Sequence, residues 1–134
     1  MGLIEGDHFD DHQCLDLLRR SQIGRVGLSL GAVPAIVPVR YEMHPDGIVV
    51  ASSIDQVAKA MERAIVALQC DGFDEDERKR WTVLAVGPTE RVDSEEAAAM
   101  AGGFRMTAQD AFWSASHFFS LRPEVFSGRW LELI

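Results

Sequence analysis

The junction between a strand and a helix holds the first candidates for chemistry. Ser52 and Ser53 follow the apolar run at 48–51 and precede a segment with helical character. Free backbone N–H groups and the helix dipole make such a junction a natural site for an anion. Ser53 and Gln56 also fit a capping box, which needs no ligand. The spacing therefore leaves an anion site and a simple helix cap as alternatives.

Other reactive side chains form weaker patterns. His8 and His12 are four residues apart, and one helical face could present both to a metal ion, but no third ligand is evident. Ser114 lacks the G-x-S-x-G surroundings of a nucleophilic serine. Cys14 and Cys70 show no metal-type spacing and are expected to be buried, reduced thiols. No metal site is predicted, and neither G-x-G-x-x-G nor a P-loop occurs in the sequence.

Length and composition limit the classes of function. The 134 residues suit one domain spanning 1–134, and the 47% hydrophobic and 25% charged fractions are those of a globular protein. A net charge of -8 argues against nucleic acid and against an anionic membrane as partners. No apolar run of about 18 residues occurs, and the N-terminus lacks a signal-peptide pattern. We therefore expect a cytoplasmic protein that does not enter a membrane.

Short strands and helices must position these residues. Alternating apolar residues predict strands over 26–30, 33–41, 48–51, 64–70, 81–92, 118–126 and 129–133. Helical spacing and capping boxes predict helices from Asp10 or Asp11 to about Arg20, over 54–63, from Asp93 to about Ala101, and near 107–110. Pro34 and Pro38 require an edge, a bulge or a bend in the second strand. The charged segment 71–80 is interpreted as a solvated loop, and Gly87-Pro88 as a kink. The pattern predicts an α+β domain built on an antiparallel barrel of about six strands.

Five segments resemble the pyridoxamine 5'-phosphate oxidase-like split-barrel family, in the order in which that family has them. The matching segments are Ile23-Gly24-Arg25-Val26-Gly27-Leu28, Pro34-Ala35-Ile36-Val37-Pro38-Val39-Arg40-Tyr41, Ile65-Val66-Ala67-Leu68-Gln69-Cys70-Asp71, Trp81-Thr82-Val83-Leu84-Ala85-Val86-Gly87 and Leu121-Arg122-Pro123-Glu124-Val125-Phe126-Ser127-Gly128-Arg129. Each segment alone is weak evidence, but together they cover nearly the whole chain. The resemblance implies a six-stranded antiparallel split β-barrel with flanking short helices.

The resemblance also implies a homodimer with two FMN sites at the subunit interface. It makes Ser52, Ser53, Gln56 and Lys59 candidates for holding the phosphate. It places Val37, Pro38, Val39 and Arg40 along the flavin ring, with Arg40 able to reach the phosphate or the N1–C2 edge. Trp81 and Thr82 would face the partner's flavin. The alternatives are a surface salt bridge for Arg40 and an interface anchor for Trp81.

The resemblance implies an FMN-dependent oxidoreductase acting on a small molecule, with no catalytic side chain identified. No residues match a substrate pocket for pyridoxamine phosphate. The alternative is a non-catalytic dimeric barrel that binds another ligand or none. Two departures favour this alternative: the family's helix lysine would fall near Gln56 or Val57 rather than at Lys59, and Asp55 would repel a phosphate. Some members of the family use deazaflavin or haem. For deazaflavin, the few Lys and Arg residues offer little to a polyanionic tail.

Overall fold

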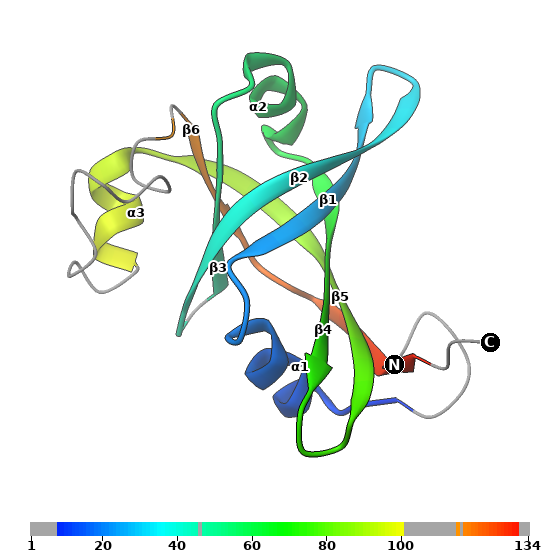
Figure 1. The fold of residues 1–134 in the computed structure, drawn as a ribbon. Coiled ribbons are helices and arrows are strands. Elements are labelled where there is room, and N and C mark those ends of the chain that lie inside the picture. The colour runs from blue at the N-terminus through cyan, green and yellow to red at the C-terminus, as the bar shows by residue number, and fades with distance from the viewer. Residues whose placement is uncertain (1–7, 46, 101–114, 116, 132–134) are drawn as a thin grey trace.

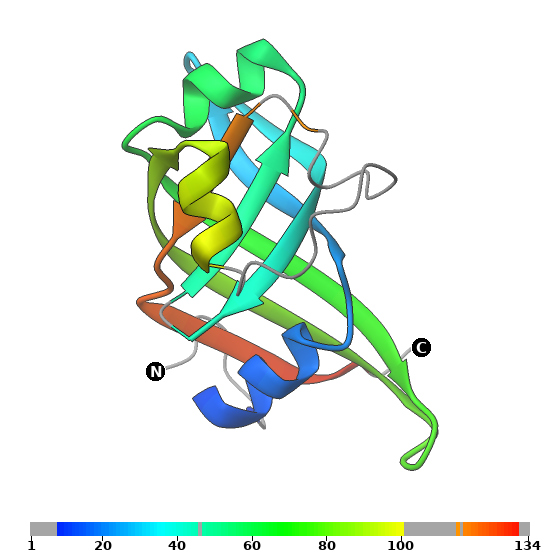
Figure 2. The ribbon, with the colours of Figure 1, turned by 90° about the vertical axis from the view of Figure 1, so that its left-hand side faces the viewer.

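Seven strands and three short helices make up the described part of the computed structural model, which covers residues 8–45, 47–100, 115 and 117–131. In chain order they are α1 (Asp11–Leu18), β1 (Ile23–Leu30), β2 (Val33–His44), β3 (Gly47–Ser52), α2 (Asp55–Met61), β4 (Ile65–Asp74), β5 (Lys79–Val92), α3 (Ser94–Met100), β6 (His117–Leu121) and β7 (Val125–Leu131). Figures 1 and 2 place α1 and α2 at opposite ends of the sheet. The third helix, α3, lies against its side.

Six of the strands close into a ring. The sheet runs in the order β4-β1-β2-β3-β6-β5, and β5 pairs back with β4, so each of the six strands has a partner on both sides over at least part of its length. Every pairing is antiparallel. The last strand, β7, lies outside the ring and pairs with the first half of β5. The predicted α+β fold with a six-stranded antiparallel split barrel is confirmed.

Two prolines in β2 mark where this strand has a free edge. Pro34 pairs with Ser29 and Pro38 with Arg25, both on β1, whereas β3 joins β2 only from Arg40 onward. Because proline has no N–H to donate, it is tolerated where one side of a strand makes no ladder. The expected edge is therefore present within a strand that is central elsewhere.

The long strand β5 changes partner half-way along. It pairs with β7 up to Val86 and with β6 from Thr89 onward. Gly87 stands at the change, and an added Cβ there would collide with the carbonyl of Arg122. The predicted kink at Gly87-Pro88 is thus a position of close backbone approach within a continuous strand, because β5 is assigned without a break from Lys79 to Val92.

The barrel interior and the inner face of α1 form one core. Cys14, Leu17 and Leu18 are buried, as their spacing predicts. Asp10 accepts a hydrogen bond from the backbone of Gln13, whose side chain bonds back to Asp10, so the helix start is closed by a full capping box. A second, smaller cluster lies on the outer side of β3 and β6 under α3, and consists of Val49, Ala51, Ala97 and Phe118.

Two predicted strand boundaries are wrong. The charged segment 71–80 is mostly strand, because β4 runs to Asp74, β5 begins at Lys79 and only 75–78 form the turn. The break between the closing strands lies at 122–124 instead of at Ser127-Gly128. Gly128 lies inside β7 because α1 packs directly on it: an added Cβ would lie 2.8 Å from the Cys14 Sγ atom.

The capping box expected at Ser53 is also wrong. The residue at the N-cap of α2 is Ile54, with no side-chain cap, and the helix covers 55–61 instead of 54–63. The Ser52 hydroxyl instead accepts a hydrogen bond from the Ile54 backbone at 3.2 Å. The capping box at Asp93 and Glu96 is confirmed by both of its hydrogen bonds.

Two further predictions concern helices. The helix expected near 107–110 falls outside the described residues. Within the described part of the chain, none of the helices has the length and apolar character needed to cross a membrane.

Candidate functional site

A pocket of about 280 Å³ lies on the outer side of the barrel, where β1, β2 and β3 meet the segment leading into α2. Its lining residues are Ile23, Pro38, Val39, Arg40, Ala51, Ser52, Ser53, Ile54 and Ala115. Five of these residues, Pro38, Val39, Arg40, Ser52 and Ser53, are among those that the sequence nominates. The sequence reasoning did not find Ile23, Ala51, Ile54 or Ala115.

Strand alternation explains which side chains reach this pocket. Ile23, Arg40 and Ala51 are successive partners across β1, β2 and β3, and partners in an antiparallel ladder point to the same face. Val39 has the opposite orientation and is only 4% exposed, so the pocket receives mainly its backbone. Val37 also points inward: it pairs with the buried Val26 and packs against the core.

The pocket combines an apolar wall with a small number of polar groups. Ile23, Pro38 and Ile54 supply hydrocarbon surface, and the side chain of Ile54 remains 53% exposed. Arg40 supplies a fixed positive charge and the fork geometry that recognises oxyanions and ring edges. Among the described lining residues none is an acid, a histidine or a cysteine. The arrangement suits binding of a flat, largely apolar group with a polar edge, and not acid–base catalysis by its own side chains.

Gln56 and Lys59 lie away from this pocket. Both are on the exposed side of α2, and neither lines the cavity. The carboxylate of Asp55 is 92% exposed and lies 2.8 Å from the His117 ring. The structure therefore separates the two serines of the predicted phosphate group from its helical members.

Trp81 and Thr82 point to opposite sides of β5. Trp81 is 2% exposed and lies inside the core, between Gly72 of β4 and Trp130 of β7. Its ring packs within the single chain, although its buried Nε1–H has no hydrogen-bond partner among the described residues. Thr82 points outward, to the same face as the pocket, and its hydroxyl accepts a hydrogen bond from Gln69 at 2.9 Å. Of the pair, Thr82 alone is placed to meet something outside the barrel.

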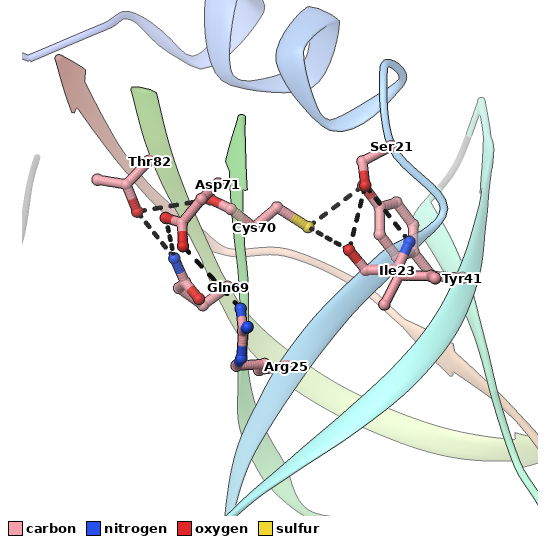
Figure 3. A network of polar contacts seen from close by, with 8 residues as sticks. All are labelled: Ser21, Ile23, Arg25, Tyr41, Gln69, Cys70, Asp71 and Thr82. Carbon is pink, nitrogen blue, oxygen red and sulfur yellow. Dashed lines mark hydrogen bonds and ion pairs between the residues drawn. The ribbon is translucent and has the colours of Figure 1, made fainter. Parts of the chain in front are cut away.

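Figure 3 shows polar contacts on both sides of β4. On the outer side, Asp71 accepts a hydrogen bond from Gln69 and lies 4.0 Å from the Arg25 guanidinium. On the inner side, the Cys70 thiol lies 3.3 Å from the Tyr41 hydroxyl, which donates to the Leu18 carbonyl at 2.6 Å.

The inner groups are structural. Burial raises the pKa of the Tyr41 hydroxyl and of the Cys70 thiol, so both are neutral at physiological pH. Burial, reinforced by nearby aspartates, likewise raises the pKa of Cys14 to about 11. A thiol that stays protonated is a poor nucleophile, so these cysteines act as packing residues.

Sequence comparison decides the family. A family model described as pyridoxamine 5'-phosphate oxidase matches residues 10–130. The chain belongs to this family. The match includes all the strands and the pocket, so the resemblance of the five segments reflects membership of the pyridoxamine 5'-phosphate oxidase family. Among curated proteins, none matches the sequence.

Solved structures share the family fold. A FAD-binding protein from Mycobacterium smegmatis has a TM-score of 0.73 at 18% identity, over 94% of this chain and 100% of that one. A FAD-binding protein from Mesorhizobium loti also has a TM-score of 0.73 at 18% identity, over 95% and 97%. A flavocytochrome from Azotobacter vinelandii has a TM-score of 0.70 at 18% identity, over 93% and 69%. At these identities, the similarity establishes the split-barrel fold.

Proposed function

We propose that this chain is a cytoplasmic, homodimeric flavoprotein that binds FMN in the pocket between β1, β2 and β3 and acts as a flavin-dependent oxidoreductase on a small molecule. The observation that carries the proposal is the pocket itself. An apolar wall, one arginine and two serines converge there from segments that the family model covers. Flavin sites need this combination of a flat apolar surface and a few placed polar groups.

The residues of the pocket fit a flavin ring with its phosphate near the rim. Ile23, Pro38 and Ile54 would contact the ring face, and Arg40 would bond the pyrimidine edge or the phosphate. Ser52 and Ser53 lie where the chain leaves the sheet and would bond the polar end of the cofactor. When bound, the flavin supplies hydride transfer at its N5 atom, and the protein supplies orientation and exclusion of water.

The size of the pocket supports a second subunit. At about 280 Å³ it is slightly smaller than the roughly 300–1,000 Å³ of small-molecule sites, so one chain would enclose only part of a flavin nucleotide. The neighbouring outer face of β1, β2, β4 and β5 is rich in apolar side chains. Ile23, Ile36 and Ile65 are 60%, 74% and 68% exposed. Large exposed apolar side chains on one face of a sheet are often found at protein–protein interfaces.

Thr82 belongs to the same outer face. Its position on β5 is separated from Arg40 on β2 by the strands β1 and β4, which corresponds to about 14 Å at the usual strand spacing. A partner subunit that covers the apolar face would bring its own pocket rim toward Thr82. The proposed dimer thus gives Thr82 a place beside the partner's cofactor.

FAD is the second candidate for the cofactor. The structures from Mycobacterium smegmatis and Mesorhizobium loti are described as FAD-binding proteins. FAD contains the FMN moiety, so the pocket residues would serve both, and the adenosine part would extend beyond the rim. A barrel that binds another ligand or none remains the alternative function, favoured by the distance of Lys59 from the pocket and by the carboxylate of Asp55 beside the rim.

Absorbance and titration test the proposal. Purified protein should retain flavin absorbance after FMN is added and the sample is desalted, and parallel titrations should rank FMN against FAD. Arg40→Ala should lower the affinity for FMN at least tenfold, since a charge-assisted hydrogen bond contributes about 1.5–3 kcal/mol. Arg122→Ala is the matched control, because Arg122 is exposed and outside the pocket. Failure to hold either flavin would refute the flavoprotein assignment, and equal affinities in both variants would remove Arg40 from the site.

A further inference from the structure

The helix α2 begins directly at the rim of the pocket and has little stability of its own. It has seven residues, and no side chain caps its first turn. Isolated helices of this length are unstable in water, so tertiary contacts must hold it. Ser53 and Ile54 line the pocket and Asp55 is the first residue of the helix. Whatever holds the start of α2 therefore also holds the rim.

A chain of polar contacts ties both ends of α2 to the sheet. His117, the first residue of β6, lies 2.8 Å from Asp55 through its Nε2 atom. Its Nδ1 atom lies 2.9 Å from the guanidinium of Arg91 on β5. Arg91 in turn donates from Nε to Glu62, the C-cap of α2, at 3.0 Å. We call these four residues, Asp55, His117, Arg91 and Glu62, the α2 clamp.

The hydrogen bonds of the α2 clamp define which ring nitrogen of His117 carries the proton. Arginine only donates hydrogen bonds, so the Nδ1 atom of His117 must accept, and Nε2 then carries the proton donated to Asp55. The imidazole is therefore neutral when all contacts are made. Arg91 is held in place by the ring of Phe119, 5.0 Å beneath its guanidinium carbon. A second proton on His117 would set one N–H against another at Arg91.

Other contacts also hold each end of α2. At the C-terminal end, the buried hydroxyl of Thr89 bonds the Met61 carbonyl, and the Thr89 backbone bonds Ala64 at 2.8 Å. At the N-terminal end, the Ile54 backbone donates to the Ser52 hydroxyl, and Val57 and Ala58 are buried in the core. Through Asp55, His117 adds a side-chain contact at this end, which borders the pocket.

We propose that His117 is a positioning residue: through Asp55 it fixes the start of α2 and with it the Ser53–Ile54 rim of the pocket. The inference rests on the proposed flavin function only for its effect on affinity. The clamp itself concerns residues of the free protein. Loss of His117 should let residues 53–58 open locally, which exposes their backbone amides and costs binding energy when the rim must be ordered around a ligand.

The test combines amide hydrogen exchange with FMN titration on the full chain. In His117→Gln, the amides of Ile54 and Ala58 should exchange about fivefold faster, and FMN should bind about fivefold more weakly, as expected for loss of one partly exposed hydrogen bond to a carboxylate. His12→Gln is the matched control, because His12 is an 82% exposed histidine on α1 that also contacts an aspartate. Glu62→Ala should change both values less than His117→Gln, since Thr89 still holds that end.

A second variant tests the same contact from the side of the helix. Asp55→Ala gives a second variant for hydrogen exchange, since its highly exposed side chain makes misfolding a small risk.

Each outcome decides the inference. Faster exchange at Ile54 and Ala58 in both variants, with weaker FMN binding in His117→Gln, supports it. Unchanged exchange overturns the clamp, and faster exchange with unchanged affinity overturns the positioning role. If the wild-type protein binds no flavin, the proposed cofactor is wrong, and the exchange data alone decide whether His117 holds the rim.

Discussion

The helices α1 and α2 have nearly the same length and lie at opposite ends of the barrel, but they are held by different means (Figures 1 and 2). The N-terminal helix, α1, has a complete capping box and buries Cys14, Leu17 and Leu18 in the main core. The helix α2 also buries three side chains in that core, those of Val57, Ala58 and Met61, but it lacks a side-chain cap, and polar side chains contact both of its ends. The two helices therefore differ in how their ends are held, and the uncapped helix start borders the pocket.

This difference indicates which part of the structure can open locally. Buried apolar contacts, which both helices make, resist opening, whereas a helix end held by surface polar contacts opens locally at low cost. The rim of the pocket has to admit a ligand, and a rim that adjoins the uncapped start of α2 can open for the ligand and then close around it. The core around α1 then supplies the rigid frame.

The largest effect on stability should follow from removing a buried side chain that packs α1 on the core. Leu18 is fully buried, and Leu18→Ala should lower the free energy of unfolding by about 2–5 kcal/mol through lost burial and a residual cavity. Urea denaturation measures the change. Leu15→Ala, on the half-buried side of the same helix, is the control and should cost less. Equal losses in both variants would contradict the view that α1 is held mainly by its buried stripe.

Alkaline pH should weaken the same frame. The pKa of Cys14 is raised from 9.0 to about 11, mainly by burial, so the folded state keeps its thiol protonated where the unfolded chain ionises. The stabilising contribution is complete below about pH 9 and is lost as pH rises toward 11, with Tyr41 and Cys70 acting in the same direction. Urea denaturation at several pH values measures the slope. Cys14→Ala should flatten it, and a slope that is unchanged in this variant would mean that Cys14 does not contribute.

The smallest effect should distinguish the two helix starts. Asp10→Ala removes the N-cap of α1 and should cost about 1 kcal/mol. Ser53→Ala should change the free energy of unfolding by less than about 0.5 kcal/mol, because Ser53 is not the cap of α2. Thermal unfolding of the two variants side by side gives the comparison. A larger loss at Ser53 than at Asp10 would reverse the assignment of the capped helix.

Local sequence patterns predict the fold well where burial on one face of an element alone determines the spacing of its apolar residues. The stripe of Cys14, Leu17 and Leu18 predicts α1, and alternation predicts β1 and β5, because burial on one face forces these periods. The strand boundaries near Gly128 and 71–80 fail for a tertiary reason. Gly128 is required by the approach of α1, and the charged residues of 71–80 lie on a strand pair that extends past the barrel.

The candidate site is predicted in part for a similar reason. Arg40 and Ser52 are found from the resemblance, and the structure brings both to one pocket. Ile23 and Ile54 are missed because each occupies an exposed position, where a sequence pattern gives apolar residues no role. Their only signal is isoleucine on the outward side of a strand or at a helix cap. Trp81 is ambiguous in sequence, since aromatic residues serve cores and ligand sites alike, and only the fold shows that it is buried.

The closure of the ring by β6 has a consequence for how the chain folds. This five-residue strand joins β3 to β5, and its pairs with β3 link residues 48–52 to residues 117–121. Contacts that join such distant parts of a chain form slowly, since the intervening loop must be closed first. During synthesis, the five preceding strands, β1 to β5, can already pair with one another, with their apolar inner face partly uncovered until β6 leaves the ribosome. The arrival of β6 therefore decides when the molecule stops being vulnerable to aggregation.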